Sequence, residues 1–234
     1  MDIEGSVCLV TGGNRGLGEV FVRQLIGAGA AKVYAGARDP SAVTVPGAHA
    51  VQLDITDHDQ VAAAAAACGD VSVLINNAGI MLASNHLNPD GEQAAEREMR
   101  TNYFGTMSMC RAFAPVLGRN GGGALVNILS VASWYASPFT GTYASSKAAA
   151  WLLTNEVRLQ LREQGTHVVG VHASFIDTDM SALLTDVPKV SPQSVVEQTV
   201  RAIREGHKEV LADERTRQVK AALPRDLELL YDPL

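Results

Sequence analysis

Thr11-Gly12-Gly13-Asn14-Arg15-Gly16-Leu17-Gly18 joins a short apolar run, Ser6–Thr11, to a segment with helical periodicity, Gly18–Ala28. The glycines permit the sharp strand-to-helix turn in which a backbone approaches a pyrophosphate at a helix N-terminus. The turn also has a purely structural explanation, because any sharp strand–helix turn needs glycine. Its place at the first strand–helix junction of a repeated pattern favours a dinucleotide site, although the spacing is GxxxGxG rather than GxGxxG.

Strand-like and helical segments alternate along nearly the whole chain. Short β-branched strands with helical crossovers predict a doubly wound α/β fold of Rossmann type, with about seven parallel strands and helices on both faces. We expect one dinucleotide-binding domain over residues 1–234, with the substrate site built into it. The expected strands are Ser6–Thr11, Lys32–Ala35, Ala48–Leu53, Val71–Asn76, Ala124–Leu129, Val168–His172 and Glu209–Leu211. The expected helices are Gly18–Ala28, Asp57–Cys68, Gln93–Leu117, Tyr143–Glu163 and Pro192–Gly206.

Composition excludes several classes of protein. The 234 residues are 47% hydrophobic and 19% charged, which is typical of a chain with a large core. The net charge of −6 argues against a general nucleic-acid or membrane-surface binder. No run approaches the roughly 18 apolar residues of a membrane span, and the acidic start predicts no signal peptide. The three cysteines lack CxxC spacing, so we expect reduced thiols in a cytoplasmic protein. No His/Cys spacing indicates a metal site.

The end of the second strand, Ala35-Gly36-Ala37-Arg38-Asp39, bears on cofactor choice. An NAD site places a carboxylate at this strand end, for the ribose 2′-hydroxyl. Here small residues precede Arg38, and Arg15 lies in the glycine turn; two guanidiniums suit a 2′-phosphate, so we expect NADP(H) to be preferred over NAD(H). Alternatively, Arg38 pairs with Asp39 or points into water. Asp54, after the third strand, either binds the adenine amino group or begins a turn.

Tyr143 and Lys147 are four residues apart on an expected helix and share one face. This spacing lets the lysine lower the tyrosine pKa from about 10 toward working pH. Such a tyrosine can give a proton to an oxygen or take one from it. The same pair also occurs on ordinary solvated helices, so its meaning depends on the other motifs of the chain.

These motifs together resemble those of the short-chain dehydrogenases/reductases of the single-domain type, over nearly the whole chain. The glycine turn, Asn76-Asn77-Ala78-Gly79, Asn102, Ser130, and the Tyr143/Lys147 pair occur in the family's order, with Ser130 thirteen residues before Tyr143. The resemblance implies that Tyr143 is the general acid/base and that Ser130 binds the reacting oxygen. It also implies that Lys147 favours the tyrosinate and binds the nicotinamide ribose, and that Asn102 holds a proton-relay water. Taken singly, Ser130 could be a turn cap and Asn102 a satisfied buried amide.

The resemblance is strongest to the NADPH-preferring carbonyl reductases of the family, through Gly-Gly-Asn-Arg-Gly and Ala-Arg-Asp. One departure follows the sixth strand, where Ala173-Ser174 replaces the usual Pro-Gly and puts the rigidity of that turn in question. The implied cofactor contacts are Thr11, Gly12, Asn14, Arg15, Gly16, Leu17, Gly18, Arg38, Asp54, Ile55, Asn77, Ala78, Gly79, Tyr143, Lys147, Ile176 and Thr178.

We therefore expect an oxidoreductase that transfers hydride between NADP(H) and a lipophilic ketone or aldehyde, or a secondary alcohol. A non-catalytic NADP(H)-binding sensor or scaffold is the alternative, and the physiological direction stays open. Few charges occur among the candidate pocket residues, which are Met81, Leu82, Ala132, Trp134, Tyr135, Phe139, Phe175, Met180 and Leu183. Trp134 and Phe139 could instead pack beneath the loop that carries them.

Two further features predict a cover and an assembly. Residues 175–192 follow the sixth strand at the ligand-binding edge and include the weakly periodic, proline-containing stretch Ser181–Pro192, so we expect them to cover the substrate. The expected helices Gln93–Leu117 and Tyr143–Glu163 carry more apolar and small positions than one sheet face needs. Family members pair these helices across a twofold axis, so we expect a homodimer or homotetramer.

Overall fold

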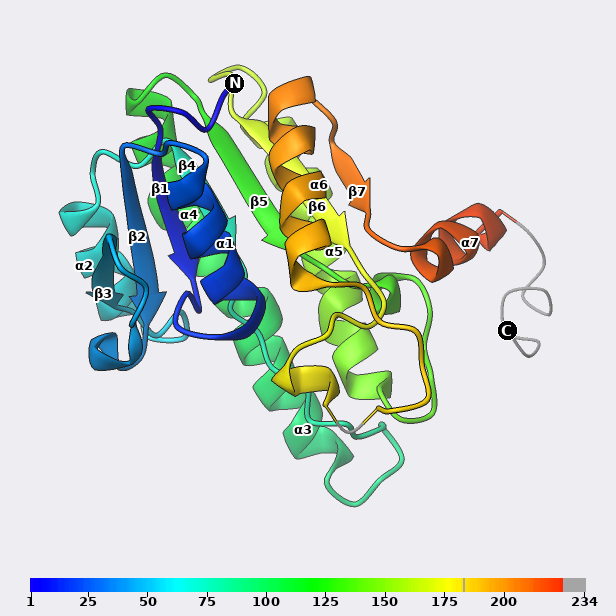
Figure 1. Ribbon diagram of the computed structural model, residues 1–234. Coiled ribbons are helices and arrows are strands. Elements are labelled where there is room, and N and C mark those ends of the chain that lie inside the picture. The colour runs from blue at the N-terminus through cyan, green and yellow to red at the C-terminus, as the bar shows by residue number, and fades with distance from the viewer. Residues whose placement is uncertain (183, 225–234) are drawn as a thin grey trace.

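Seven parallel strands form the central sheet in the computed structural model, which describes residues 1–182 and 184–224 (Figure 1). Their spatial order is β3-β2-β1-β4-β5-β6-β7, and helices cover both faces, so the predicted doubly wound fold is confirmed. The strands are β1 Val7–Thr11, β2 Lys32–Ala37, β3 Ala48–Gln52, β4 Val73–Asn76, β5 Ala124–Ile128, β6 His167–His172 and β7 Glu209–Leu211, each within two residues of the predicted bounds. The strand order reverses between β1 and β4, where such sheets bind ligands at their carboxyl edge.

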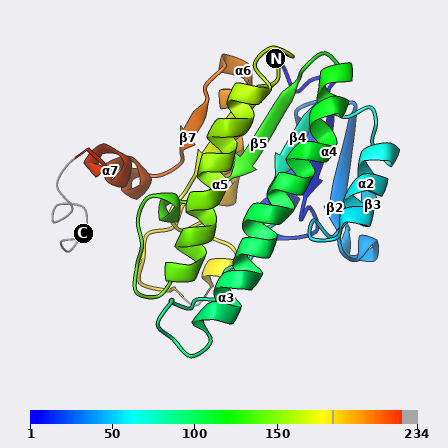
Figure 2. The same ribbon diagram turned by 180° about the vertical axis from the view of Figure 1, so that it is seen from behind.

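The helices lie in two layers, α1 and α6 on the face seen in Figure 1 and α2, α4 and α5 on the face seen in Figure 2. The α-helices are α1 Gly16–Gly27, α2 His58–Ala67, α3 Gly91–Glu98, α4 Thr106–Arg119, α5 Gly141–Gln160, α6 Pro192–Glu205 and α7 Glu214–Ala222. A π-helix, η2 Met99–Gly105, joins α3 to α4, and three 3-10 turns are η1 Pro40–Ala42, η3 Val131–Ser133 and η4 Asp179–Ser181. None of the helices in the described ranges has the length and apolar character of a membrane span.

Strand β1 explains how the sheet is buried on both faces. Cys8 and Val10 pack toward α1 and α6, whereas Leu9 packs toward α4, and none of the three is exposed to solvent. Alternate side chains of a strand point to opposite faces, so a strand covered on both sides is apolar throughout. The apolar segments from which we predicted the strands therefore contribute side chains to two hydrophobic cores, one on each face of the sheet.

Local signals set the helix ends. The Asp57 side chain accepts hydrogen bonds from the backbone N–H groups of Asp59 and Gln60 and caps α2. Ser191 caps α6 in the same way, with Pro192 at the first helical position. The α6 helix ends where Gly206 takes the left-handed conformation with φ 76°.

Two elements differ from the prediction. The expected helix Gln93–Leu117 is a continuous run of α3, the π-helix and α4, and the wider turn of the π-helix contains Asn102. The α7 helix was not predicted, because its nine residues are mostly polar and only Thr216 and Val219 are buried.

Candidate active site

The glycine turn is shaped to admit a ligand at the N-terminus of α1. Gly12 has φ 65°, a left-handed conformation that favours glycine. A Cβ on Gly18 would lie 2.0 Å from the Gly12 carbonyl oxygen, so position 18 has no room for any side chain. The exposed helix N-terminus beside this close-packed backbone favours an anionic group such as a pyrophosphate. This cradle fits the dinucleotide that the sequence predicts.

Hydrogen bonds tie the glycine turn to the end of β4. The Thr11 hydroxyl accepts from the backbone N–H groups of Asn77 and Ala78, both at 3.0 Å. The Asn77 amide donates back to the carbonyl oxygens of Thr11 and Gly12, at 3.0 and 3.3 Å. The switch point between β1 and β4 is thus rigid on both sides, which holds the predicted cofactor residues of the two segments together.

The charged residues predicted to select the cofactor lie at the same edge of the sheet. Arg15 is 71% exposed, and its Nη1 lies 3.7 Å from Oδ2 of Asp179, in η4. Arg38 is exposed just beyond the end of β2. Asp54 accepts hydrogen bonds from the N–H and hydroxyl of Thr56, at 2.9 and 2.7 Å, so it begins a turn, as one of the two alternatives predicted.

Ser130, Tyr143 and Lys147 meet above the carboxyl ends of β5 and β6. Ser130 follows β5 and forms a hydrogen bond with the Tyr143 hydroxyl. Its hydroxyl also accepts from the Ala132 N–H at 3.1 Å, so the cap role and the site role coexist. Lys147 is buried, with Nζ 5.7 Å from the centre of the Tyr143 ring.

The prediction that Lys147 lowers the pKa of Tyr143 is wrong for this structure. Burial raises the pKa of Tyr143 to about 12, while its hydrogen bond with Ser130 lowers it and the charge of Glu98 raises it. Burial also lowers the pKa of Lys147 to about 8. Lys147 donates to the Ile128 carbonyl oxygen at 2.9 Å. Removal of both groups from water therefore outweighs the attraction expected from their spacing.

Asn102 and Glu98 form hydrogen bonds with the backbone of the segment that follows β4. The Asn102 amide oxygen accepts from the Ile80 N–H at 2.8 Å, and its nitrogen donates to the Ile80 carbonyl and to Ser146, both at 2.9 Å. These contacts fit the satisfied-amide alternative. Gly79 passes close by, since a Cβ there would lie 3.0 Å from Asn102 Oδ1 and 3.6 Å from Lys147 Nζ.

Glu98 is a site residue that the sequence interpretation missed. It lies one turn before Asn102, is completely buried, and accepts from the Leu82 N–H at 2.6 Å through Oε1. Its Oε2 has no hydrogen-bond partner among the described residues. A carboxylate four residues before Asn102, on the buried side of an amphipathic helix, was the available signal.

The Ala173-Ser174 turn has a replacement for the missing Pro-Gly. The Asp213 carboxylate accepts from the Ser174 N–H at 2.7 Å and from the Ser174 hydroxyl at 2.9 Å. The same carboxylate caps α7 by accepting from the Thr216 N–H and hydroxyl. Two charge-assisted bonds thus hold the turn in place of a proline ring.

Asp213→Ala is expected to destabilise the fold by roughly 2–3 kcal/mol, because it removes a helix cap and hydrogen bonds to a charged group. The measurement is the free energy of unfolding in urea. Asp39→Ala is the matched control, since Asp39 caps only the short, exposed η1. Equal losses in the two variants would contradict the role given to Asp213.

Beyond this turn, the predicted covering segment folds back over the glycine turn. Ile176 pairs with Val190 in a parallel bridge, and the Ser181 hydroxyl donates to the Ile176 carbonyl at 2.6 Å. A Cβ on Gly16 would lie 3.8 Å from the Thr178 side chain. The structure therefore brings Ile176 and Thr178 to the cofactor edge, where they were predicted.

The candidate pocket residues separate into two groups. Phe139 and Met180 are 77% and 51% exposed, whereas Met81, Leu82 and Phe175 are partly buried. Trp134 does not join them, because its ring stacks on His172 at 3.8 Å and meets Trp151 edge-on. Leu183 lies outside the described residues.

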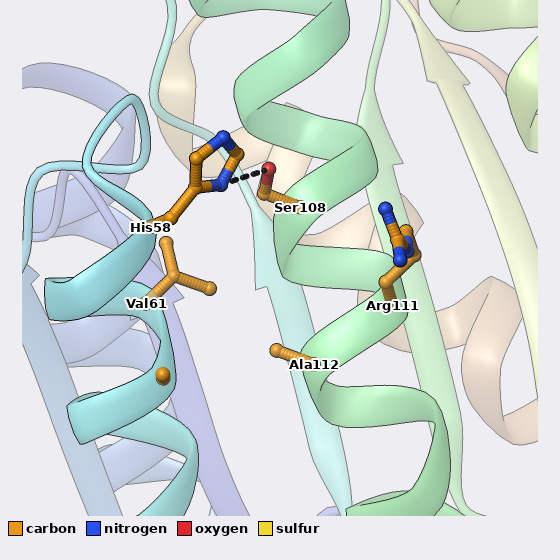
Figure 3. Close-up of a pocket in the computed structure, with 6 residues that line it drawn as sticks. His58, Val61, Ser108, Arg111 and Ala112 are labelled. Carbon is orange, nitrogen blue, oxygen red and sulfur yellow. Dashed lines mark hydrogen bonds between the residues drawn. The ribbon is translucent and has the colours of Figure 1, made fainter.

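A separate groove of about 330 Å³ lies between α2 and α4 (Figure 3). His58 and Ser108 face each other across it, with Nδ1 and Oγ 3.4 Å apart. None of the predicted site residues lines this groove. Across the part of the chain that the structure describes, no group of three or more His, Cys, Asp or Glu side chains could hold a metal ion.

Comparison with known proteins agrees with this geometry. The family model described as short chain dehydrogenase matches residues 6–188. A solved short chain dehydrogenase from Burkholderia cenocepacia J2315, in complex with NADP, is 38% identical, with a TM-score of 0.94 and 100% of each chain covered. A short chain dehydrogenase/reductase from Burkholderia phymatum, in complex with NAD, is 25% identical, with a TM-score of 0.84 over 100% of this chain and 99% of that one.

A curated relative leads to the same family. The 3-oxoacyl-(acyl-carrier-protein) reductase FabG of Staphylococcus aureus is 31% identical over 191 residues, which cover 76% of this chain and 77% of that protein. The family match includes the glycine turn, the end of β4, and Ser130, Tyr143 and Lys147. The chain therefore belongs to the short-chain dehydrogenase family of NAD(P)-dependent oxidoreductases.

Proposed function

We propose that this protein is an NADP(H)-dependent carbonyl reductase acting on a lipophilic ketone or aldehyde. The observation that carries the proposal is the meeting of Ser130, Tyr143 and Lys147 beside the end of β5. This constellation shares the carboxyl edge of the sheet with a close-packed glycine turn at the N-terminus of α1, the kind of turn that binds a pyrophosphate. A proton donor, an oxygen-binding hydroxyl and a nucleotide cradle together suit reduction of a carbonyl.

Each group has a defined task in this proposal. When bound, the nicotinamide supplies the hydride. Tyr143 donates its hydroxyl proton to the carbonyl oxygen, and Ser130 hydrogen-bonds the same oxygen as negative charge develops on it. Lys147, held by the Ile128 carbonyl oxygen, has its charge beside Tyr143 and would bind the nicotinamide ribose when the cofactor is bound. Asn102 holds the Ile80 backbone through two hydrogen bonds and, in our proposal, orders the water that returns a proton.

The protonation state of Tyr143 favours reduction over oxidation at neutral pH. Burial raises the pKa of Tyr143 to about 12, so the phenol carries its proton at neutral pH. Reduction needs this neutral phenol as a proton donor, whereas alcohol oxidation needs the phenolate as a base. The resting protein therefore holds the proton that reduction requires, and the same groups serve alcohol oxidation once that proton is lost.

The preference for NADP(H) rests on Arg15 and Arg38. The ion pair of Arg15 with Asp179 is long and exposed on both sides, so it is weak and Arg15 is available to a 2′-phosphate. Arg38 is exposed at the neighbouring strand end, where no carboxylate precedes it. The remaining cofactor contacts, including Asn14, Leu17 and Ile55, are proposed as the sequence predicts them.

Arg38→Ala should raise the KM for NADPH by roughly ten- to a hundred-fold, because a hydrogen bond to a charged group contributes about 1.5–3 kcal/mol. The KM for NADH should change little, since that cofactor lacks the 2′-phosphate. Steady-state kinetics with both cofactors measures the effect, and Arg23→Ala serves as control because Arg23 pairs with Glu19 on the outer side of α1. An equal rise for both cofactors would refute the assignment of Arg38.

Exposed apolar side chains support a lipophilic substrate. Phe139 and Met180 project from the loop after η3 and from η4, the two segments that border the site. We propose that residues 175–192 cover the substrate, because Thr178 and Asp179 of this segment lie against Gly16 and Arg15. The anchoring of Ser174 by Asp213 removes the main reason to prefer a non-catalytic binding protein.

We also propose a cytoplasmic homodimer or homotetramer. Leu152 and Leu159 are 66% and 62% exposed and lie two turns apart on one face of α5. Phe104, on the other helical run predicted to pair, is 50% exposed, and exposed apolar side chains of this kind favour an interface. Size-exclusion chromatography with light scattering measures the assembly.

A panel of carbonyl compounds, run in parallel with NADPH and NADH, tests the proposed function. The panel should contain aromatic and long-chain ketones and aldehydes beside small charged carbonyls. Oxidation of NADPH with the lipophilic compounds is the expected result. Nucleotide binding without turnover of any carbonyl would refute the proposed enzymatic activity. Turnover of only small charged carbonyls would refute the proposed lipophilic substrate class.

A further inference from the structure

The α7 helix, which the sequence interpretation missed, contacts both walls of the candidate site. It lies beyond β7 at one side of the sheet (Figures 1 and 2). Its cap residue Asp213 holds the Ser174 turn. Arg215 lies over the rings of Tyr135 and Phe175, at 6.0 and 5.5 Å from their centres. The helix therefore touches the loop after Ser130 as well as the segment after β6.

Lys220 makes the closest contact between a cation of this helix and an aromatic ring. Its Nζ lies 4.3 Å from the centre of the Trp134 ring and 5.9 Å from that of Trp151. Glu209 of β7 holds the same ammonium through a 2.9 Å ion pair. A cation placed over the face of tryptophan is attracted by the ring and is best held where water is partly excluded. Lys220 thus contacts the Trp134 ring while Glu209 holds its ammonium.

A second contact of the Trp134 ring leads to Ser130. The Trp134 ring stacks on His172 with ring centres 3.8 Å apart and planes inclined by 21°. His172 is completely buried, and its Nδ1 lies 3.0 Å from the backbone carbonyl oxygen of Ser130. A carbonyl oxygen only accepts, so Nδ1 carries the proton and donates it.

The surroundings of His172 keep its ring neutral. Burial lowers the pKa of His172 to about 3, the hydrogen bond to Ser130 raises it, and the charges of Lys220, Lys147 and Arg158 lower it further. Its Nε2 has no hydrogen-bond partner among the described residues and lies 3.6 Å from Oε1 of Glu209. Because Glu209 is paired with Lys220, this carboxylate is not free to draw a proton onto the ring.

We propose that Lys220 is a positioning residue for the proposed reaction, which acts through Trp134 and His172 to hold Ser130 in place. Three consecutive contacts connect the two residues. The Lys220 ammonium lies over the Trp134 indole, the indole stacks on the His172 imidazole, and the imidazole donates a hydrogen bond to the Ser130 carbonyl oxygen. A displaced Ser130 loses its alignment with the Tyr143 hydroxyl and the reacting oxygen. The inference rests on the role of Ser130 in the proposed function.

Lys220→Met tests this role, because methionine keeps most of the aliphatic stem and removes the charge. We expect kcat with the best carbonyl of the panel to fall roughly ten- to a hundred-fold, since a small misplacement of a catalytic group costs that much. The Kd for NADPH and the midpoint of unfolding should stay near those of the wild type. Lys220→Arg should restore kcat, because a guanidinium also binds a tryptophan face and a carboxylate.

Arg217→Met is the matched control. It removes one positive charge from the same helix, but Arg217 pairs with Glu214 and with the Leu211 carbonyl, not with the aromatic cluster. Its kcat should match that of the wild type. Tryptophan fluorescence reports on the cluster directly, because the only two tryptophans of the chain, Trp134 and Trp151, both lie beside Lys220. Emission should change in Lys220→Met and not in Arg217→Met.

The outcomes separate this inference from the proposed function. A wild-type protein that reduces no carbonyl overturns the proposed function, and the inference with it. If the wild type is active, two results would overturn the inference alone. In the first, Lys220→Met keeps the kcat of the wild type. In the second, kcat, cofactor affinity and stability all fall in Lys220→Met, and Lys220→Arg does not restore them. A selective loss of kcat that arginine restores supports it.

Discussion

Tyr143→Phe is expected to lower carbonyl turnover by roughly 10²–10⁴-fold, the usual contribution of a positioned general acid. Phenylalanine keeps the ring beside Lys147 and removes only the hydroxyl. The fold should tolerate the change, because the Ser130 hydroxyl retains its contacts with the Ala132 N–H and the Ala173 carbonyl. The loss should therefore fall on kcat, while the Kd for NADPH stays close to that of the wild type.

The measurement is steady-state turnover of the best substrate of the carbonyl panel, with cofactor binding followed separately by fluorescence. Tyr34→Phe is a matched control, because Tyr34 loses the same atom in β2 and contacts Asp70 and Lys32 away from the site. Turnover of Tyr143→Phe within a few-fold of the wild type would sink the assignment of the general acid. Equal losses in both variants would point to a general effect on the fold.

The features that the sequence predicts well are those encoded over short distances. The strand–glycine turn–helix unit around Gly12 needs only local periodicity and the conformational freedom of glycine. Ser130, Tyr143 and Lys147 are also separated by fixed spacings, so the predicted set and the set brought together in the structure agree. The roles of these residues stay predictions until the variants are measured.

The features that the sequence did not predict depend on tertiary contacts. The pKa of Tyr143 follows the removal of its hydroxyl from water in the folded chain, which raises the pKa instead of lowering it as the spacing to Lys147 predicts. The α7 helix lacks an apolar stripe, so periodicity does not reveal it; the one available signal was Asp213 as a helix cap. Trp134 is a pocket candidate because it follows the carboxyl end of a strand, and packing beneath its loop is the alternative. Contacts with His172 and Lys220 agree with that alternative.

Lys147→Met is expected to abolish turnover and, in addition, to change how the stability of the fold depends on pH. The pKa of Lys147 is 10.5 in an unfolded chain and about 8 in the folded protein, where burial lowers it. Between these values the unfolded chain binds a proton that the folded protein does not, so the contribution of Lys147 to stability rises with pH. The difference in pKa corresponds to about 3 kcal/mol.

Methionine has no such titration, so the wild type should gain about 3 kcal/mol relative to Lys147→Met between about pH 7 and about pH 10.5. The loss of the hydrogen bond to Ile128 adds a constant cost to the variant, which does not affect this change with pH. Free energies of unfolding in urea, measured for both proteins across this range, give the result. Lys208→Met, at an exposed position, should follow the wild-type curve. Parallel curves for Lys147→Met and the wild type would show that folding does not lower the pKa of Lys147. They would contradict the placement of a buried, destabilised ammonium beside Tyr143.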